Sequence, residues 1–436
     1  MGTLILVILF CTMAGTATAK EKILFEWNKG EAGNFGGVGF ALGDINGDGA
    51  ADIALRLQDE IDVFFGGTDA DDLADLVIAP PSGPHPGFPL QGPIDLNGDG
   101  QDDLIVAANG ATREGPIYCY WGGAAVDDIP DYVVHGSWTA ASACRAGAFM
   151  PNDMIDDFAV AKTETNYNYV DVYEGGEAPA EEPSWGRIEY LKFALWEYHF
   201  CYAGDFNNDG YGDIVTGAPL ATSVCLRYET VQGWCSDGGQ VFLYWGGPER
   251  LRGALIVHGN EDFIELGFQT SANCDLNADG YSDVVSTADG ADQTWAIFGR
   301  PGYPSRILQP SRLLAGGRSA TALGDINGDG ADDVATRDNS GQLRIFLGSA
   351  TFDTTEDAYI TLPPEDTRAF KWLFRVNDFD GDGYDDIGVT LGESVADQGL
   401  ITSYRIYSGL NALAVPVQDQ TVGGLKSLFH GIKKNK

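Results

Sequence analysis

The fold is decided by nine residues near the start of the chain, Asp44-Ile45-Asn46-Gly47-Asp48-Gly49-Ala50-Ala51-Asp52, because their pattern returns five more times in 436 residues. The shared pattern is Asp-x-Asn/Asp-x-Asp-Gly-x-x-Asp, and we number its positions 1 to 9. Oxygens at positions 1, 3, 5 and 9, with a backbone carbonyl at position 7, suit a hard cation with several oxygen ligands, such as calcium. Gly at position 6 allows a sharp turn there. The six copies begin at Asp44, Asp95, Asp205, Asp275, Asp325 and Asp378.

Each copy offers four side-chain ligands, so we predict about six structural calcium sites. The predicted ligands are Asp44, Asn46, Asp48, Asp52, Asp95, Asn97, Asp99, Asp103, Asp205, Asn207, Asp209, Asp213, Asp275, Asn277, Asp279, Asp283, Asp325, Asn327, Asp329, Asp333, Asp378, Asp380, Asp382 and Asp386. An EF-hand would carry a bidentate Glu at position 12 between two helices. Position 12 is Leu55 in the first copy and Val389 in the last, and the flanks are typical of strands. Asx turns without a metal would be an adequate explanation for a single loop. They explain less well why six loops repeat the same residue types at the same nine positions.

The long gap between the loops at Asp95 and Asp205 contains a seventh unit. Residues 146–160 parallel residues 203–215 but lack the first Asp and the Gly, so we expect no metal there. Each unit has a strand, a loop, an apolar strand, an aromatic strand that ends in Gly, and a fourth strand. Seven units of about 50 residues predict an all-β, seven-bladed β-propeller of four-stranded blades. The calcium loops would join the first two strands of most blades.

The N-terminal run Ile23-Leu24-Phe25-Glu26-Trp27 is typical of a strand but has no blade of its own. We predict that it completes the last blade, whose other strands come from residues 370–409. Pairing the two ends of the chain would close the ring and remove an exposed edge. Residues 412–417 are the alternative for the same place.

Three short motifs flank the loops. Phe35-Gly36 precedes the loop of the first unit, and Gly267-Phe268 precedes the loop of the fifth unit, which begins at Asp275. Gly217-Ala218-Pro219 follows the loop of the fourth unit. In these motifs the sequence resembles FG-GAP repeat proteins of the integrin alpha-chain N-terminal propeller type, over roughly residues 22–409. The resemblance implies a seven-bladed propeller with calcium loops on one face and ligand binding on the opposite face.

The chain divides into three predicted parts. Residues 1–19 are typical of a signal peptide, with an apolar run and Ala17-Thr18-Ala19 as the cleavage site. Residues 20–417 form the propeller, and residues 418–436 form a basic C-terminal tail. The tail is either a disordered, charge-balancing segment or a short amphipathic helix in weak contact with a membrane or an acidic partner. No later segment is long enough to span a membrane, so we expect a secreted or cell-surface protein.

Charge and cysteines narrow the choice of partners and compartment. The formal net charge of −38 argues against nucleic acid, whose phosphates would be repelled. Six cysteines remain after the predicted cleavage, and an even number in an exported protein favours disulfides. We predict a bridge between Cys225 and Cys235. Cys144 and Cys201, which occupy equivalent places in neighbouring blades, are either bridged or buried free thiols.

The candidate recognition segment is the long loop of residues 219–239, which presents Arg227, Tyr228 and Trp234. If the family geometry holds, it lies on the face opposite the calcium loops; the alternative is that it only caps the channel. The sequence contains no His-Glu-x-x-His, no Gly-x-Ser-x-Gly and no phosphate-binding Gly-rich loop before a helix, so we assign no catalytic residue.

These features favour an exported, calcium-binding module for binding or adhesion, with a protein or glycan as ligand. One alternative is a propeller-type enzyme that degrades polysaccharides, such as a lyase. A cluster of basic and acidic side chains at the channel mouth would favour that enzyme. The other alternative is a structural cell-surface component, which would self-associate without a ligand.

Overall fold

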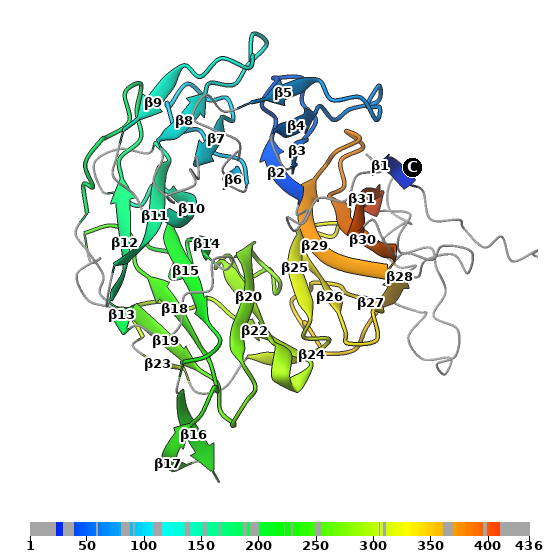
Figure 1. Cartoon of the computed structure of the whole chain (residues 1–436). Coiled ribbons are helices and arrows are strands. Elements are labelled where there is room, and N and C mark those ends of the chain that lie inside the picture. The colour runs from blue at the N-terminus through cyan, green and yellow to red at the C-terminus, as the bar shows by residue number, and fades with distance from the viewer. Residues whose placement is uncertain are drawn as a thin grey trace, which may run out of the picture.

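Seven antiparallel sheets follow one another around a ring in the computed structural model (Figure 1). The structure describes residues 23–28, 39–57, 60–79, 88–89, 92–107, 116–135, 140–150, 155–164, 167–185, 190–191, 200–221, 223–227, 230–248, 254–304, 306–307, 311–360, 369–395 and 399–409. This arrangement confirms the predicted seven-bladed propeller and its hidden seventh unit. The predicted signal peptide, the basic tail and Phe35-Gly36 lie outside the described residues.

The first three blades each contain four strands in sequence order. Blade 1 consists of β2 (Gly39–Gly43), β3 (Asp52–Arg56), β4 (Ile61–Phe64) and β5 (Leu76–Ile78). Blade 2 consists of β6 (Phe88–Pro89), β7 (Leu104–Ala107), β8 (Ile117–Tyr120) and β9 (Tyr132–Val134). Blade 3 consists of β10 (Ala140–Gly147), β11 (Asp157–Glu164), β12 (Tyr167–Tyr173) and β13 (Tyr190–Leu191).

Blade 4 departs from the expected four strands. It contains β14 (Phe200–Gly204), β15 (Asp213–Ala218), β18 (Gln240–Tyr244) and β19 (Ala254–His258), and β23 (Arg306–Ile307). The fifth strand, β23, comes from the next unit and pairs in parallel with β19, which covers the outer edge of the blade. Between β15 and β18, the hairpin of β16 (Ser223–Arg227) and β17 (Thr230–Cys235) forms a separate sheet that projects from the ring (Figure 1).

The last three blades return to four strands. Blade 5 consists of β20 (Leu266–Cys274), β21 (Asp283–Ala288), β22 (Gln293–Ile297) and β24 (Arg312–Ala315), with the short helix η2 (Asp289–Ala291) after β21. Blade 6 consists of β25 (Ser319–Gly324), β26 (Asp333–Arg337), β27 (Leu343–Phe346) and β28 (Ala358–Ile360). Blade 7 consists of β29 (Ala369–Asn377), β30 (Asp386–Val395), β31 (Gly399–Tyr407) and β1 (Ile23–Asn28).

The hydrophobic core is divided among the blade junctions. Seven clusters of buried apolar residues exist among the described residues, and each is built by two adjacent blades. Consecutive side chains of β3 pack against different neighbouring blades. Ala54 packs against blade 2, whereas Ile53 and Leu55 pack against blade 7. A strand that is buried on both faces needs a continuous apolar run, and this explains why the second strand of each unit lacks polar alternation.

A glycine at the end of each third strand lets the backbones of adjacent blades meet. A Cβ added at Gly66 would lie 2.2 Å from the carbonyl oxygen of Ala51, in the loop of its own blade. It would also lie 2.5 Å from the carbonyl oxygen of Phe379, in the loop of the preceding blade. The same clash, 1.9 to 2.5 Å from the carbonyl oxygen at position 8, excludes a side chain at all seven equivalent positions, Gly66, Gly122, Gly175, Gly246, Gly299, Gly348 and Gly409.

The N-terminal strand closes the ring, as predicted. β1 pairs antiparallel with β31, and Trp27 lies opposite Tyr404 (Figure 1). Arg405 donates a hydrogen bond of 2.9 Å to the carboxylate of Glu26, which adds an ion pair to the ladder. β1 therefore takes the place for which residues 412–417 were the alternative. The closed ring leaves neither blade 7 nor blade 1 without a neighbour.

We predict that Trp27→Ala destabilises the protein, because the Trp27 side chain is buried between Phe64 and Tyr404 at the closing junction. Loss of a buried Trp costs about 3–5 kcal/mol. Denaturant unfolding checks this, with Ile23→Ala as the matched control on the same strand, because Ile23 is 40% exposed. Equal stability of the two variants would contradict a closing role for β1.

Candidate metal loops

All six predicted metal loops join the first strand to the second strand of their blades. Because these strands run in the same direction in every blade, the six loops lie on one face of the ring. The loops are residues 44–52 between β2 and β3, 95–103 between β6 and β7, 205–213 between β14 and β15, 275–283 between β20 and β21, 325–333 between β25 and β26, and 378–386 between β29 and β30.

The carboxylate at position 1 organises each loop. In the first loop, Asp44 accepts hydrogen bonds from the backbone N–H groups of Asp48 at 3.0 Å and Gly49 at 2.8 Å. The same two bonds, from positions 5 and 6, recur in the other five loops. The glycine at position 6 has φ between 84° and 95° in all six copies, a left-handed conformation that only glycine adopts easily. The sequence pattern thus encodes a specific turn.

Positions 1, 3 and 5 bring their oxygens together in this turn. In the last loop, carboxylate oxygens of Asp378, Asp380 and Asp382 all lie within 4.8 Å of one another. Three carboxylates at this spacing repel one another unless a cation lies among them. In the other loops an Asn replaces the middle Asp, and in the first loop Asn46 donates to Asp48 at 3.0 Å. Converging carboxylate and amide oxygens are the ligands that calcium prefers, so the donor set fits this ion.

Position 9 is buried at the end of the turn, and both of its carboxylate oxygens accept backbone hydrogen bonds. Asp52 is completely buried and accepts from the N–H groups of Ile45 and Gly66, both at 2.9 Å. Burial raises the pKa of Asp52 to about 7, although these two hydrogen bonds oppose the shift. Asp103, Asp283 and Asp386 behave alike, each with a pKa raised to about 7 by burial. A divalent cation in the loop would lower these pKa values by Coulomb attraction.

Blade 3 separates the structural role of position 9 from metal binding. Its unit has Ala148 in place of the first ligand and is one residue longer than the intact loops, yet it retains Asp157 at the place of position 9. Asp157 accepts from the N–H groups of Met150 at 2.8 Å and Gly175 at 3.1 Å, as its counterparts do in the intact loops. The Asp at position 9 therefore joins the loop to the third strand with or without a cation. Sequence reasoning missed this role, although the retention of Asp157 in the one degenerate unit signals it.

The predicted recognition segment lies at the opposite edge of blade 4. The hairpin β16–β17 joins the second strand to the third, whereas the metal loops join the first strand to the second, so the two lie on opposite faces. Arg227 ends β16 and Trp234 lies on β17. Their side chains, and the whole of Tyr228, lie outside what the structure describes.

The cysteines fall into two groups. Cys119, Cys144, Cys201 and Cys274 are free thiols, which decides between the two alternatives for Cys144 and Cys201. In the hairpin, Ser223 lies opposite Cys235 and Cys225 lies opposite Gly233, so the two cysteines are two pairs apart along the ladder. The Cys225–Cys235 bridge remains a prediction.

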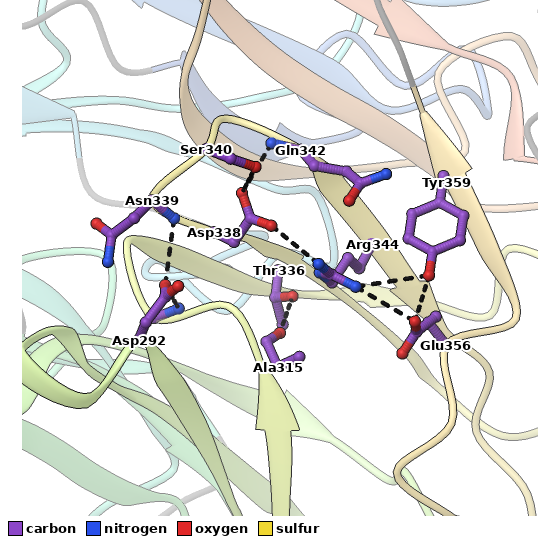
Figure 2. Close-up of polar contacts among 11 residues, drawn as sticks. Asp292, Ala315, Thr336, Asp338, Asn339, Ser340, Gln342, Arg344, Glu356 and Tyr359 are labelled. Atoms are coloured by element: carbon purple, nitrogen blue, oxygen red, sulfur yellow. Dashed lines mark hydrogen bonds and ion pairs between the residues drawn. The ribbon is translucent and has the colours of Figure 1, made fainter.

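On the same face as the hairpin, a polar network ties together loops of blades 5 and 6 (Figure 2). One carboxylate oxygen of Asp292, after η2, accepts from the N–H groups of Gly317 at 3.1 Å and Asn339 at 3.2 Å. In blade 6, Arg344 bridges Asp338 at 2.9 Å and Glu356 at 3.3 Å (Figure 2). No sequence motif indicated these residues, because the partners lie in different loops between strands and are far apart in the sequence.

Two stretches of this chain, residues 92–120 and 202–244, match the family model described as FG-GAP repeat. This chain carries FG-GAP repeats. Both matched stretches contain one metal loop and continue to the third strand of the blade, so the repeat corresponds to the loop with its scaffold.

This chain is also similar to integrin alpha chains, which confirms the predicted resemblance. Integrin alpha-5 of Xenopus laevis is 26% identical over 209 residues, which cover 47% of this chain and 19% of that protein. Integrin alpha-8 of Gallus gallus is 32% identical over 123 residues, which cover 27% of this chain and 11% of that protein. The matches thus span a fifth or less of the length of these two relatives.

Solved structures agree with the fold. The crystal structure of BBS1N in complex with ARL6DN matches with a TM-score of 0.50 and 9% identity, covering 88% of this chain and 95% of that one. At this identity the likeness shows the fold alone.

Within the described residues, no helix has the length and hydropathy needed to span a bilayer.

We predict that Asp157→Ala lowers stability equally with and without calcium. The substitution leaves the buried N–H groups of Met150 and Gly175 without their acceptor, which costs about 1–3 kcal/mol for each group. Unfolding in calcium and in chelator measures the effect, with Asp52→Ala as the comparison in an intact loop, where the loss should be larger in calcium. A calcium-dependent loss at Asp157 would show that blade 3 also binds the ion.

Proposed function

We propose that this FG-GAP propeller is an exported, calcium-stabilised module that binds a protein or glycan ligand on the face opposite its metal loops. The observation that carries the proposal is the contrast between the two faces. One face repeats a single loop, which suits a scaffold. The other face varies from blade to blade, with a projecting hairpin in blade 4 and a polar network in blades 5 and 6. Variable loops on a rigid scaffold are the usual location of binding sites.

The similarity to integrin alpha chains supports an adhesive or ligand-binding role outside the cell. The predicted signal peptide fits the same compartment. A ligand could contact Arg227, Tyr228 and Trp234 from the hairpin, together with the loops that Asp292 ties together. Because the Asp292 network already fixes these loops, binding would cost little ordering entropy there.

In this proposal, calcium increases the stability of the folded protein. The side chains at positions 1, 3, 5 and 9 and the carbonyl at position 7 would hold each ion in the six intact loops. The ion supplies two positive charges to a group of converging carboxylates, such as Asp378, Asp380 and Asp382. An ion that binds only the folded state stabilises that state by mass action.

We predict that chelation of calcium lowers the melting temperature by roughly 10 °C or more, because each site at a hundredfold excess over Kd contributes about 2.7 kcal/mol. Differential scanning calorimetry in calcium and in EGTA measures the change. The control is the variant Asp378→Ala/Asp380→Ala/Asp382→Ala, which should show a smaller shift because one site is lost. An unchanged melt of the native protein in EGTA would refute the stabilising role.

We predict that the calcium-loaded protein retains a ligand from an array of extracellular proteins and glycans without altering it. The assay reads retention together with new reducing ends or unsaturated sugar products. Deletion of residues 223–235 should reduce retention, whereas Asp353→Ala, an exposed change in blade 6, should not. Accumulating sugar product would replace the binding module with the lyase alternative, and self-association without any ligand would favour the structural component.

A further inference from the structure

Each junction between blades connects the loop of one blade to the loop of the next through position 8. The backbone N–H of Asp275, at position 1 in blade 5, donates to the carboxylate of Asp332 at 2.8 Å. Asp332 is at position 8 of the loop in blade 6, and its own N–H donates back to the carbonyl oxygen of Asp275 at 3.0 Å. We call this reciprocal pair a two-point clamp. It fixes the backbone of a predicted metal ligand from the neighbouring blade.

The clamp recurs around the ring. Asp385 makes both bonds to Asp325, at 3.0 and 3.2 Å. Asp156 makes both bonds to Asp95, at 3.0 and 3.3 Å. The carboxylate of Asp102 accepts from the N–H of Asp44 at 2.9 Å. Three further junctions show the backbone bond from position 8 to position 1, namely Ala51 to Asp378, Gly212 to Ala148, and Ser282 to Asp205.

At two junctions, a glycine before position 1 makes room for the Asp side chain at position 8 of the next blade. A Cβ added at Gly324 would lie 1.8 Å from the carboxylate oxygen of Asp385. A Cβ added at Gly43 would lie 2.2 Å from the carboxylate oxygen of Asp102. At the junction of blades 7 and 1, position 8 is Ala51, and there the preceding residue is Asn377 instead of glycine. A glycine there is not required for the clamp, because Ile94 precedes Asp95 and Cys274 precedes Asp275.

The carboxylates at position 8 have partners other than a metal. Arg375 lies 3.9 Å from Asp385 and donates to the carbonyl oxygen of Asn273 at 2.8 Å. Arg145 lies 2.9 Å from Asp156, and its guanidinium stacks over the ring of Tyr202 at 4.7 Å. These two arginines supply positive charge beside the clamp. Position 8 thus acts on the loop through the backbone of position 1.

We propose that the Asp at position 8 is a positioning residue for the calcium site of the preceding blade, and not for the loop in which it lies. The proposal rests on the calcium binding proposed above. In metal sites, groups that orient the ligands typically contribute 10- to 100-fold to metal affinity. Because Asp332 joins the loops of blades 5 and 6, and Asp385 joins those of blades 6 and 7, calcium binding in these three blades is coupled. Such coupling is reciprocal between neighbouring sites.

The test is a calcium titration of the whole protein followed by hydrogen–deuterium exchange and mass spectrometry, read separately at residues 275–283 and 325–333. Asp332→Ala should weaken the calcium midpoint at 275–283 on the order of tenfold, and leave the midpoint at 325–333 within about twofold. Asp332→Asn, which keeps an acceptor oxygen, should restore most of the affinity at 275–283. The blade should tolerate alanine, because Ala51 occupies the equivalent position in blade 1.

Two further variants make the result decisive. Asp385→Ala should weaken the loop at 325–333 instead, so the affected site moves back by one blade with the substitution. Asp353→Ala removes the same charge from an exposed position of blade 6 and should change neither loop. Weakening confined to the loop that carries the substitution, or equal weakening of both loops, would overturn the proposal. Absence of calcium-dependent protection in every loop of the native protein would instead refute calcium binding itself.

Discussion

The close approach of backbones at each blade junction is the constraint on which the rest of this structure depends. A third-strand glycine such as Gly66 lies between the loop of its own blade and the loop of the preceding blade, where no Cβ fits. Its N–H reaches the buried carboxylate at position 9, and the next N–H, from Gly67, reaches the carbonyl oxygen of Phe379 at 2.6 Å. Because buried backbone groups must be paired, every loop is held by its own blade and by a neighbour. The metal loops are thus part of the packing of the ring.

This constraint divides the propeller into a uniform face and a variable face. On the uniform face, the six intact loops share one length and conformation, because positions 1, 2 and 8 make backbone contacts across a junction and position 9 joins the loop to the third strand of its own blade. On the opposite face, the connections between second and third strands make backbone contacts that differ from blade to blade, such as Glu265 to Asp237 between blades 4 and 5. That freedom accommodates the hairpin of β16 and β17 in blade 4, and the loops that Asp292 ties together in blades 5 and 6 (Figure 2). Diversity of recognition can arise there without disturbing the scaffold.

Charge connects this architecture to the surroundings of the protein. The chain has a formal net charge of −38, and the six intact loops place 19 carboxylates at predicted ligand positions on the uniform face. Position 9 carboxyls are buried and have raised pKa values, while positions 1 and 5 place further carboxylates above them. Folding therefore brings negative charges together, and the cost falls when a divalent cation is present. At position 8 the charge is offset by arginines, Arg145 beside Asp156 and Arg375 near Asp385.

The sequence by itself determined the number of blades, the position of the metal loops and the closure of the ring by residues 23–27. These features follow from patterns within one repeat, such as the turn from Asp44 to Asp52, or from a strand that lacked a blade. Only the tertiary structure decided the roles of position 8 and of Asp292, and the addition of β23 to blade 4. Asp332 and Asp275 are members of different repeats, and each pattern is complete without the other. Their contact exists because packing the blades brings the two loops together, and a pattern that describes one repeat contains no information about its neighbour.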